Sequence, residues 1–169
     1  GNRPSAVMDN YHGYIRYSSV FFPAENGTIE LNWKPPDDFA KNNLPRNLLY
    51  QFNGLFVWIS SNQLNFALFN REERRWEIIS RSALNFDINQ WYQISVSYGD
   101  NGMFLFLNGT KITEGKFKGA INDKNDIYLA RGPLWSISDK PISSGYFETI
   151  KIYDYQKISK LVSGEIKWE

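Results

Sequence analysis

Cysteine is absent from this chain of 169 residues, histidine occurs once, and methionine occurs twice. Without cysteine there is no disulfide, no cysteine-ligated zinc and no cysteine nucleophile. The missing disulfides also argue mildly against a eukaryotic secreted domain, because many such domains rely on them. The fold must therefore be held by an apolar core, which a chain of this length can bury without covalent cross-links.

An excess of charge of one sign is lacking, and so are long apolar runs. The chain carries 19 basic and 18 acidic side chains, and its densest charged run, residues 71–75, mixes both signs. Nucleic-acid binding needs a concentrated basic face, so we expect no nucleic-acid partner. No apolar run reaches the length of about 18 residues that could span a bilayer, so we expect no membrane insertion by this segment.

Catalytic motifs are lacking as well. The single histidine, His12, is not accompanied by a Gly-x-Ser-x-Gly nucleophile motif, and the chain has no glycine-rich phosphate loop. The adjacent Glu72 and Glu73 would point to opposite faces of a strand and lie among arginines, which predicts a solvated turn. We therefore expect a protein that is not an enzyme.

Aromatic residues are abundant, with 12 Phe, 10 Tyr and 6 Trp, and this composition suits pleated, half-buried strands. Apolar and polar residues alternate in short segments that end at turn residues. The predicted strands are 28–33, 48–52, 55–60, 64–69, 76–81, 93–98, 103–107, 127–130 and 147–153, with a loop over 34–47. This pattern predicts an all-β, two-sheet antiparallel β-sandwich, with residues 1–169 as a single domain. The stretch 154–169 fits either a helical turn or a final edge strand.

Three segments resemble the laminin-G-like family of concanavalin-A-like jelly rolls. Residues 27–35 read Gly-Thr-Ile-Glu-Leu-Asn-Trp-Lys-Pro, residues 89–109 form a hairpin pattern that opens with a tryptophan and closes on Phe-Leu-Asn-Gly, and residues 145–153 match the family's C-terminal strand. The resemblance implies a jelly-roll fold and a lectin-like role. It also implies that Trp33 and Trp91 belong to the core.

The resemblance further implies a calcium ion near the sheet edge, which needs several oxygen ligands. Asp9, Asn10 and Glu148 are the candidate ligands, although the family usually has one or two Asp where this chain has Glu148-Thr149. Residues 100–102 and 122–126 are rival oxygen-rich stretches, and all of these segments could instead be ordinary turns. Glycanases of the same fold carry a Glu-x-Asp-x-x-Glu strand, and this chain has none.

Several predicted strands are apolar on both faces, whereas a sandwich needs only one buried face per sheet. The second face must form a binding surface or be covered by loops such as 34–47 or 131–145. We expect a concave sheet that carries rings beside Asn65 or Gln51, and a lid or anchor in the long loop 131–141. The candidate ligand-binding residues are Trp58, Phe104, Phe106, Tyr128 and, in that loop, Trp135.

These features predict a non-catalytic, lectin-like module that binds carbohydrate and belongs to a larger extracellular or cell-surface protein. The opening residues 1–4 favour a segment cut from a longer parent. The alternative is an adhesion module of the same fold that contacts a protein surface, because aromatic residues also dominate protein interfaces.

Overall fold

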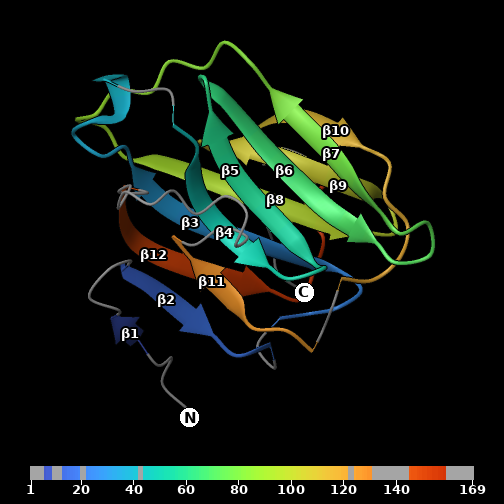
Figure 1. The fold of residues 1–169 in the computed structure, drawn as a ribbon. Coiled ribbons are helices and arrows are strands. Elements are labelled where there is room, and N and C mark those ends of the chain that lie inside the picture. The colour runs from blue at the N-terminus through green and yellow to red at the C-terminus, as the bar shows by residue number, and fades with distance from the viewer. Residues whose placement is uncertain are drawn as a thin grey trace, which may run out of the picture.

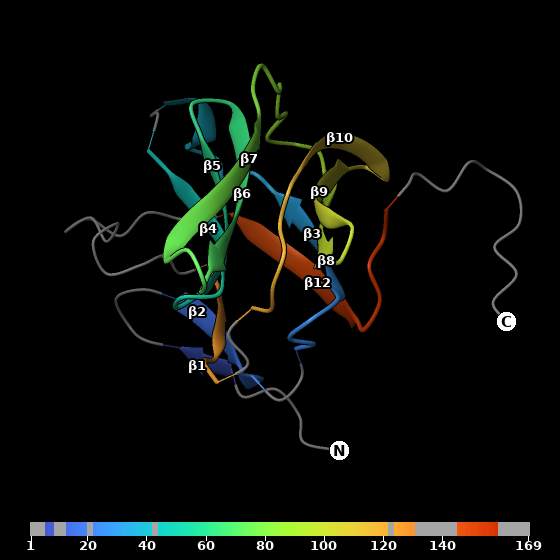
Figure 2. The same cartoon turned by 90° about the vertical axis from the view of Figure 1, so that its right-hand side faces the viewer.

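The structure is a computed structural model that describes residues 6–8, 13–19, 22–41, 44–121, 124–130 and 145–158. Two antiparallel sheets lie face to face as two layers (Figure 1 and, turned by a quarter, Figure 2). The elements are β1 (Ala6–Met8), β2 (Gly13–Tyr17), β3 (Gly27–Lys34), η2 (Phe39–Lys41), β4 (Arg46–Gln51), β5 (Leu55–Ser60), β6 (Gln63–Asn70), β7 (Arg75–Arg81), β8 (Tyr92–Gly99), β9 (Gly102–Leu107), β10 (Thr110–Gly115), β11 (Ile127–Leu129) and β12 (Tyr146–Tyr153). The predicted all-β, two-sheet antiparallel sandwich is therefore confirmed.

The first sheet has seven strands in the order β1-β2-β11-β4-β5-β6-β7. Its strands β4 to β7 form a meander in which each strand pairs with the next one in the sequence. The turns need residues that accept the left-handed conformation, and Asn53 (φ 49°) and Asn62 (φ 60°) supply it. The turn after β6 is held by Asn70, whose Oδ1 accepts hydrogen bonds from the backbone N–H groups of Glu72 and Glu73. These two glutamates are exposed, which confirms the predicted solvated turn.

The second sheet has five strands in the order β10-β9-β8-β3-β12. The hairpins β8–β9 and β9–β10 are local, whereas β3 pairs with β8 on one side and with β12 on the other. The half of this sheet formed by β8, β3 and β12 is therefore built from three segments that lie far apart in the sequence.

The core lies between the two sheets and is formed by alternate residues of every long strand. Trp33 of β3 has no exposed surface, as its predicted core position requires. Its ring meets the rings of Phe39 and Phe86 edge-on, with centroids 5.8 Å and 5.5 Å apart. These contacts use the favourable edge-to-face geometry of aromatic pairs and close one end of the core.

Every predicted strand coincides with an observed one to within two residues at each end. Strands β1, β2 and β10 were not predicted; β10 is largely polar and its register shifts between Lys111 and Thr113, which breaks the alternation. The predicted loop 34–47 contains the short helix η2 and ends early, because β4 begins at Arg46.

Residues 154–158 are neither helix nor strand, and 159–169 lie outside the described residues. Among the helices in the described segments, none is long and apolar enough to cross a membrane.

Candidate ligand-binding face

Aromatic rings gather on the outward side of the seven-stranded sheet, which we call the aromatic face. Leu55, Val57 and Ile59 of β5 point into the core, so the intervening Phe56 and Trp58 point away from it. Pairing with the neighbouring strands turns further large side chains to the same side. They are Tyr50 of β4, Phe69 of β6, Trp76 and Ile78 of β7, and Tyr128 of β11.

The centre of the aromatic face is a stacked pair of rings. The rings of Phe56 and Trp58 lie 4.5 Å apart at an interplanar angle of 21°, and Tyr50 meets Phe56 edge-on at 5.5 Å. Phe56 is buried, with 8% of its surface exposed, whereas Trp58 is only partly buried. Phe56 therefore covers one side of the Trp58 ring, and part of Trp58 remains exposed to solvent.

Asn65 and Ser80 lie in the same cross-strand row as Trp58, one on each of the next two strands. Asn65 donates from Nδ2 to the backbone oxygens of Gln63, at 3.0 Å, and Trp58, at 3.4 Å. Its Oδ1 accepts a hydrogen bond from Ser80 Oγ at 2.7 Å. The side-chain amide of Asn65 is thus engaged at both ends, and it fixes the polar edge of the ring stack.

Gln51, the other predicted polar partner, does not lie on this face. Gln51 lies two residues after Leu49 on β4, so both side chains point towards the core. Gln51 has no exposed surface, and its Nε2 donates a hydrogen bond to the backbone oxygen of Asn125 at 2.7 Å. The strand alternation that turns Tyr50 outward turns Gln51 inward. Of the two polar partners predicted as alternatives, Asn65 or Gln51, Asn65 is therefore the one that lies beside the rings.

The structure separates the predicted ligand-binding residues into two groups. Trp58 and Tyr128 share the aromatic face, but Phe104 and Phe106 belong to β9 and point outward from the five-stranded sheet, on the opposite side of the molecule. A single concave sheet bearing all four side chains was therefore a wrong prediction. Trp135 lies outside the described residues, so its place in a ligand site stays a prediction.

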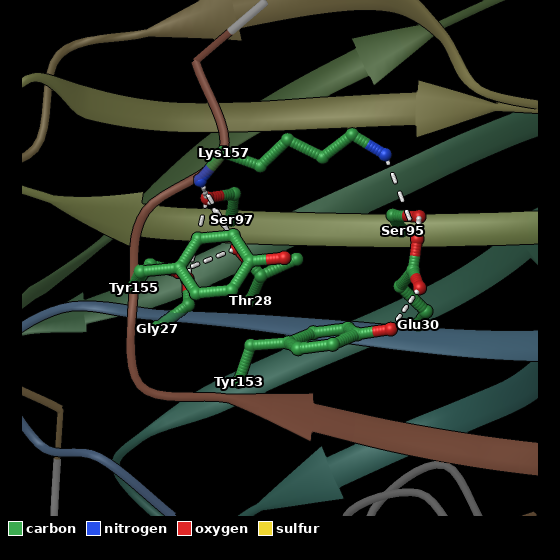
Figure 3. Close-up of polar contacts among 8 residues, drawn as sticks. All are labelled: Gly27, Thr28, Glu30, Ser95, Ser97, Tyr153, Tyr155 and Lys157. Atoms are coloured by element: carbon green, nitrogen blue, oxygen red, sulfur yellow. Dashed lines mark hydrogen bonds and ion pairs between the residues drawn. The ribbon is translucent and has the colours of Figure 1, made fainter. Parts of the chain in front are cut away.

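Phe104 and Phe106 are buried, with 7% and 0% of their surfaces exposed. Residues 154–158, which follow β12, cross the outward side of the five-stranded sheet, and we call them the strap (Figure 3). The backbone N–H of Lys157 donates to Ser97 Oγ at 2.7 Å, and its ammonium lies 5.0 Å from the centre of the Phe106 ring. The outward rings of this sheet are thus buried, as the alternative prediction required, but the segment that lies against Phe106 is the strap, which the expectation of loop 34–47 or 131–145 did not include. The Lys111 ammonium of β10 lies 5.2 Å from the centre of the Phe104 ring.

The Glu30 carboxylate of β3 joins Lys157 of the strap to side chains of β8 and β12 (Figure 3). It accepts hydrogen bonds from the hydroxyls of Tyr153, at 2.8 Å, and Ser95, at 3.1 Å, and pairs with the Lys157 ammonium at 3.5 Å. Both charged side chains of this ion pair are largely shielded from solvent. Partial burial raises the pKa of Tyr153 to about 12, and the hydrogen bond to Glu30 adds to the shift.

Trp91 is exposed, which corrects its predicted place in the core. Tyr92, the next residue, faces Trp33 across the β3–β8 pairing and takes the inward position, so alternation sends Trp91 outward. Trp91 is 47% exposed and Tyr146 is 45% exposed. The Lys34 ammonium lies 5.9 Å from the Trp91 ring centre and 4.7 Å from that of Tyr146.

The predicted calcium ligands are described only in part. Asp9 and Asn10 lie outside the described residues, and Glu148 is exposed on β12, where its Oε2 accepts a hydrogen bond from Asn32 Nδ2 at 3.2 Å. Within the described segments, no three His, Cys, Asp or Glu side chains come together as a metal site would need. A calcium ion held by Asp9, Asn10 and Glu148 stays a prediction from the family resemblance.

Comparison with protein families identifies the class of this fold. Residues 9–160 match the model of the concanavalin A-like lectin/glucanases superfamily, and the chain belongs to this family. The resemblance seen in the sequence is thereby confirmed. No curated protein is similar enough to this chain to be called a relative.

Solved structures of the same fold include sugar-binding and receptor-binding proteins. The CBM40 domain of a Ruminococcus gnavus sialidase, bound to α2,3-sialyllactose, is 16% identical over 80% of this chain and 79% of its own, with a TM-score of 0.62. A pentraxin from Limulus polyphemus is 12% identical over 92% of this chain and 76% of its own, with a TM-score of 0.64. The receptor-binding domain of a botulinum neurotoxin C/D mosaic is 13% identical over 86% of this chain, which spans only 38% of that domain, with a TM-score of 0.64. At these identities the likeness shows the fold.

Proposed function

We propose that this chain is a non-catalytic, lectin-like module that binds carbohydrate on its aromatic face, in an extracellular or cell-surface protein. The observation that carries the proposal is the partly exposed Trp58, whose ring is stacked on the buried ring of Phe56. The sialyllactose-bound CBM40 domain supports it by analogy, since that domain has the same fold.

The physical reason lies in the shape of a sugar ring. A pyranose presents a flat patch of C–H groups on one side, and this patch stacks on an aromatic plate while its edge hydroxyls form hydrogen bonds. The indole ring of Trp58 provides the aromatic surface. Ser80, which lies one strand beyond Asn65 in the same cross-strand row, provides a hydroxyl group beside it. A ring already fixed by Phe56 loses little conformational entropy when the ligand binds.

A screen of immobilised oligosaccharides, followed by titration with tryptophan fluorescence, tests this proposal. We expect Trp58→Ala to weaken the binding of any sugar found by at least about tenfold, as loss of a central aromatic contact does. Trp91→Ala is the matched control, because Trp91 is equally large, is exposed, and directly precedes β8 of the other sheet. A sugar bound equally by the wild type and by Trp58→Ala would disprove this site.

A protein partner is the second candidate, and one observation favours it. Ile78 lies next to the rings with 56% of its surface exposed, and an exposed aliphatic side chain beside aromatic rings is typical of a protein interface. If no sugar binds and Ile78→Asp abolishes binding to a cell surface, the chain is an adhesion module.

A further inference from the structure

The hydrogen-bond polarity of the aromatic face is fixed by Asn65. Its amide nitrogen faces the backbone oxygens of Gln63 and Trp58, at 3.0 and 3.4 Å. The reversed amide would place Oδ1 against those two acceptors, which cannot donate. The side-chain oxygen of Asn65 must therefore point to Ser80.

This orientation determines what Ser80 can offer to a ligand. A hydroxyl has one hydrogen, and Ser80 uses it in the 2.7 Å hydrogen bond to Asn65 Oδ1. The Ser80 oxygen has only lone pairs left, so it can accept hydrogen bonds from a ligand but cannot donate to it. The ligand group that meets Ser80 must carry an O–H or an N–H.

The meander that forms most of the aromatic face lies wholly within the described residues, and its strands have no charged side chain at an outward position there. Its outward residues are Asn47, Tyr50, Phe56, Trp58, Ser60, Gln63, Asn65, Ala67, Phe69, Trp76, Ile78 and Ser80. The charged residues of these strands, Arg46, Arg75, Glu77 and Arg81, have the opposite, inward parity. Beyond the meander, Arg16 of β2 points outward and pairs with Asp126 at 3.6 Å.

We infer that the aromatic face takes an uncharged sugar, which stacks on Trp58 and donates a hydroxyl or amide N–H to Ser80 Oγ. This inference rests on the proposed function and narrows its ligand class. A carboxylate or sulfate placed beside Trp58 would lose hydration without meeting a cation from β4, β5, β6 or β7. A fully ionised acid group also has no hydrogen to give to Ser80.

Paired glycans test the charge part of this inference. Neutral oligosaccharides such as lactose, chitotriose and cellotriose are titrated beside acidic forms such as 3′-sialyllactose and sulfated chitotriose, in 0.05 M and 0.5 M NaCl. We expect a neutral sugar to bind at least about tenfold more tightly than its acidic form, with an affinity that salt leaves unchanged. If Trp58→Ala abolishes binding but an acidic form is preferred, the inference is wrong and the proposed function stands.

Variants at Ser80 test the acceptor role. Ser80→Ala should weaken neutral-sugar binding about 3- to 10-fold, the effect of one neutral hydrogen bond. Ser80→Thr should retain binding because it keeps the hydroxyl, and Ser82→Ala, at an exposed serine just beyond β7, should change nothing. Unchanged affinity in Ser80→Ala would remove Ser80 from recognition. If no glycan shows binding that depends on Trp58, the proposed function itself fails.

Discussion

Two tryptophans that both match core positions of the family pattern, Trp33 and Trp91, have opposite environments in this chain. Trp33 has no exposed surface and meets Phe39, Phe86 and Tyr92, whereas Trp91 is 47% exposed. The sequence contained the information to separate them. Ile94, Val96 and Tyr98 define the inward parity of β8, and Trp91 has the other parity. The parity of β8 predicts an outward Trp91, whereas the family resemblance, which places a core tryptophan at the start of this strand, predicts an inward one; the parity is correct.

We expect Trp33→Ala to lower the free energy of unfolding by about 3–5 kcal/mol, because it leaves a cavity beneath three rings. Trp91→Ala should lower it by less than about 1 kcal/mol, the size of an exposed cation–π contact. Urea unfolding of both variants measures the two values. Equal losses in the two variants would contradict the environments described for these residues.

The strap is the element that local sequence pattern could not reveal. It has no regular secondary structure, and the residues that hold it are far away in the chain, as in the hydrogen bond from Thr28 Oγ1 to the backbone oxygen of Tyr155 at 2.8 Å. The strands could be predicted because side-chain alternation is a local property. The neighbours of the strap follow only from the way in which distant strands pair.

The same limit explains the error in the candidate site. Alternation shows that each strand has outward positions, such as Trp58 on β5 and Phe106 on β9, but it does not show which sheet a strand joins. The pairing of β8 with β3 places β9 in the five-stranded sheet. Trp58 and Tyr128 share a face because β11 pairs with β4. The pairing of β11 with β4 cannot be predicted from the alternation of residues within either strand.

We expect Glu30→Gln to destabilise the protein by roughly 2 kcal/mol, because three donors share this largely shielded carboxylate. Glu148→Gln is the control: its carboxylate is exposed and accepts one hydrogen bond, from Asn32, so the change should stay within about 0.5 kcal/mol. Urea unfolding gives both values, and hydrogen exchange at the Lys157 amide reports on the strap itself. Unchanged protection of that amide in Glu30→Gln would show that the carboxylate does not hold the strap.

At the scale of the whole molecule, several tyrosines couple stability to alkaline pH. Burial raises the pKa of Tyr98 far above its usual value, and burial and Glu30 raise that of Tyr153 to about 12. Burial also raises the pKa of Tyr155. The unfolded chain releases these protons near pH 10, so the folded state loses stability as the pH rises from about 10 towards 12.

Below about pH 10 these tyrosines are protonated in both the folded and the unfolded chain. Their ionisation should therefore leave the free energy of unfolding unchanged between neutral pH and about pH 10. Urea unfolding between pH 7 and 11.5 measures the decline, and phenolate absorbance follows the ionisation directly. Tyr153→Phe, which keeps the ring and removes the ionisable group, should make the decline shallower. A curve identical to that of the wild type would contradict the shift assigned to Tyr153.

The strand order has a consequence for a chain that is synthesised from its N-terminus. The meander that carries Trp58 is complete at residue 81, since its strands pair in sequence order. β3 emerges earlier but must wait for residues 92–99 to pair its first edge and for residues 146–153 to pair its second. During that interval its apolar side and free backbone groups are open to strands of other nascent chains. Among the strands in the described residues that become paired on both edges, β3 thus keeps an open edge for the longest stretch of synthesis, and it lies in the sheet that does not carry the aromatic face.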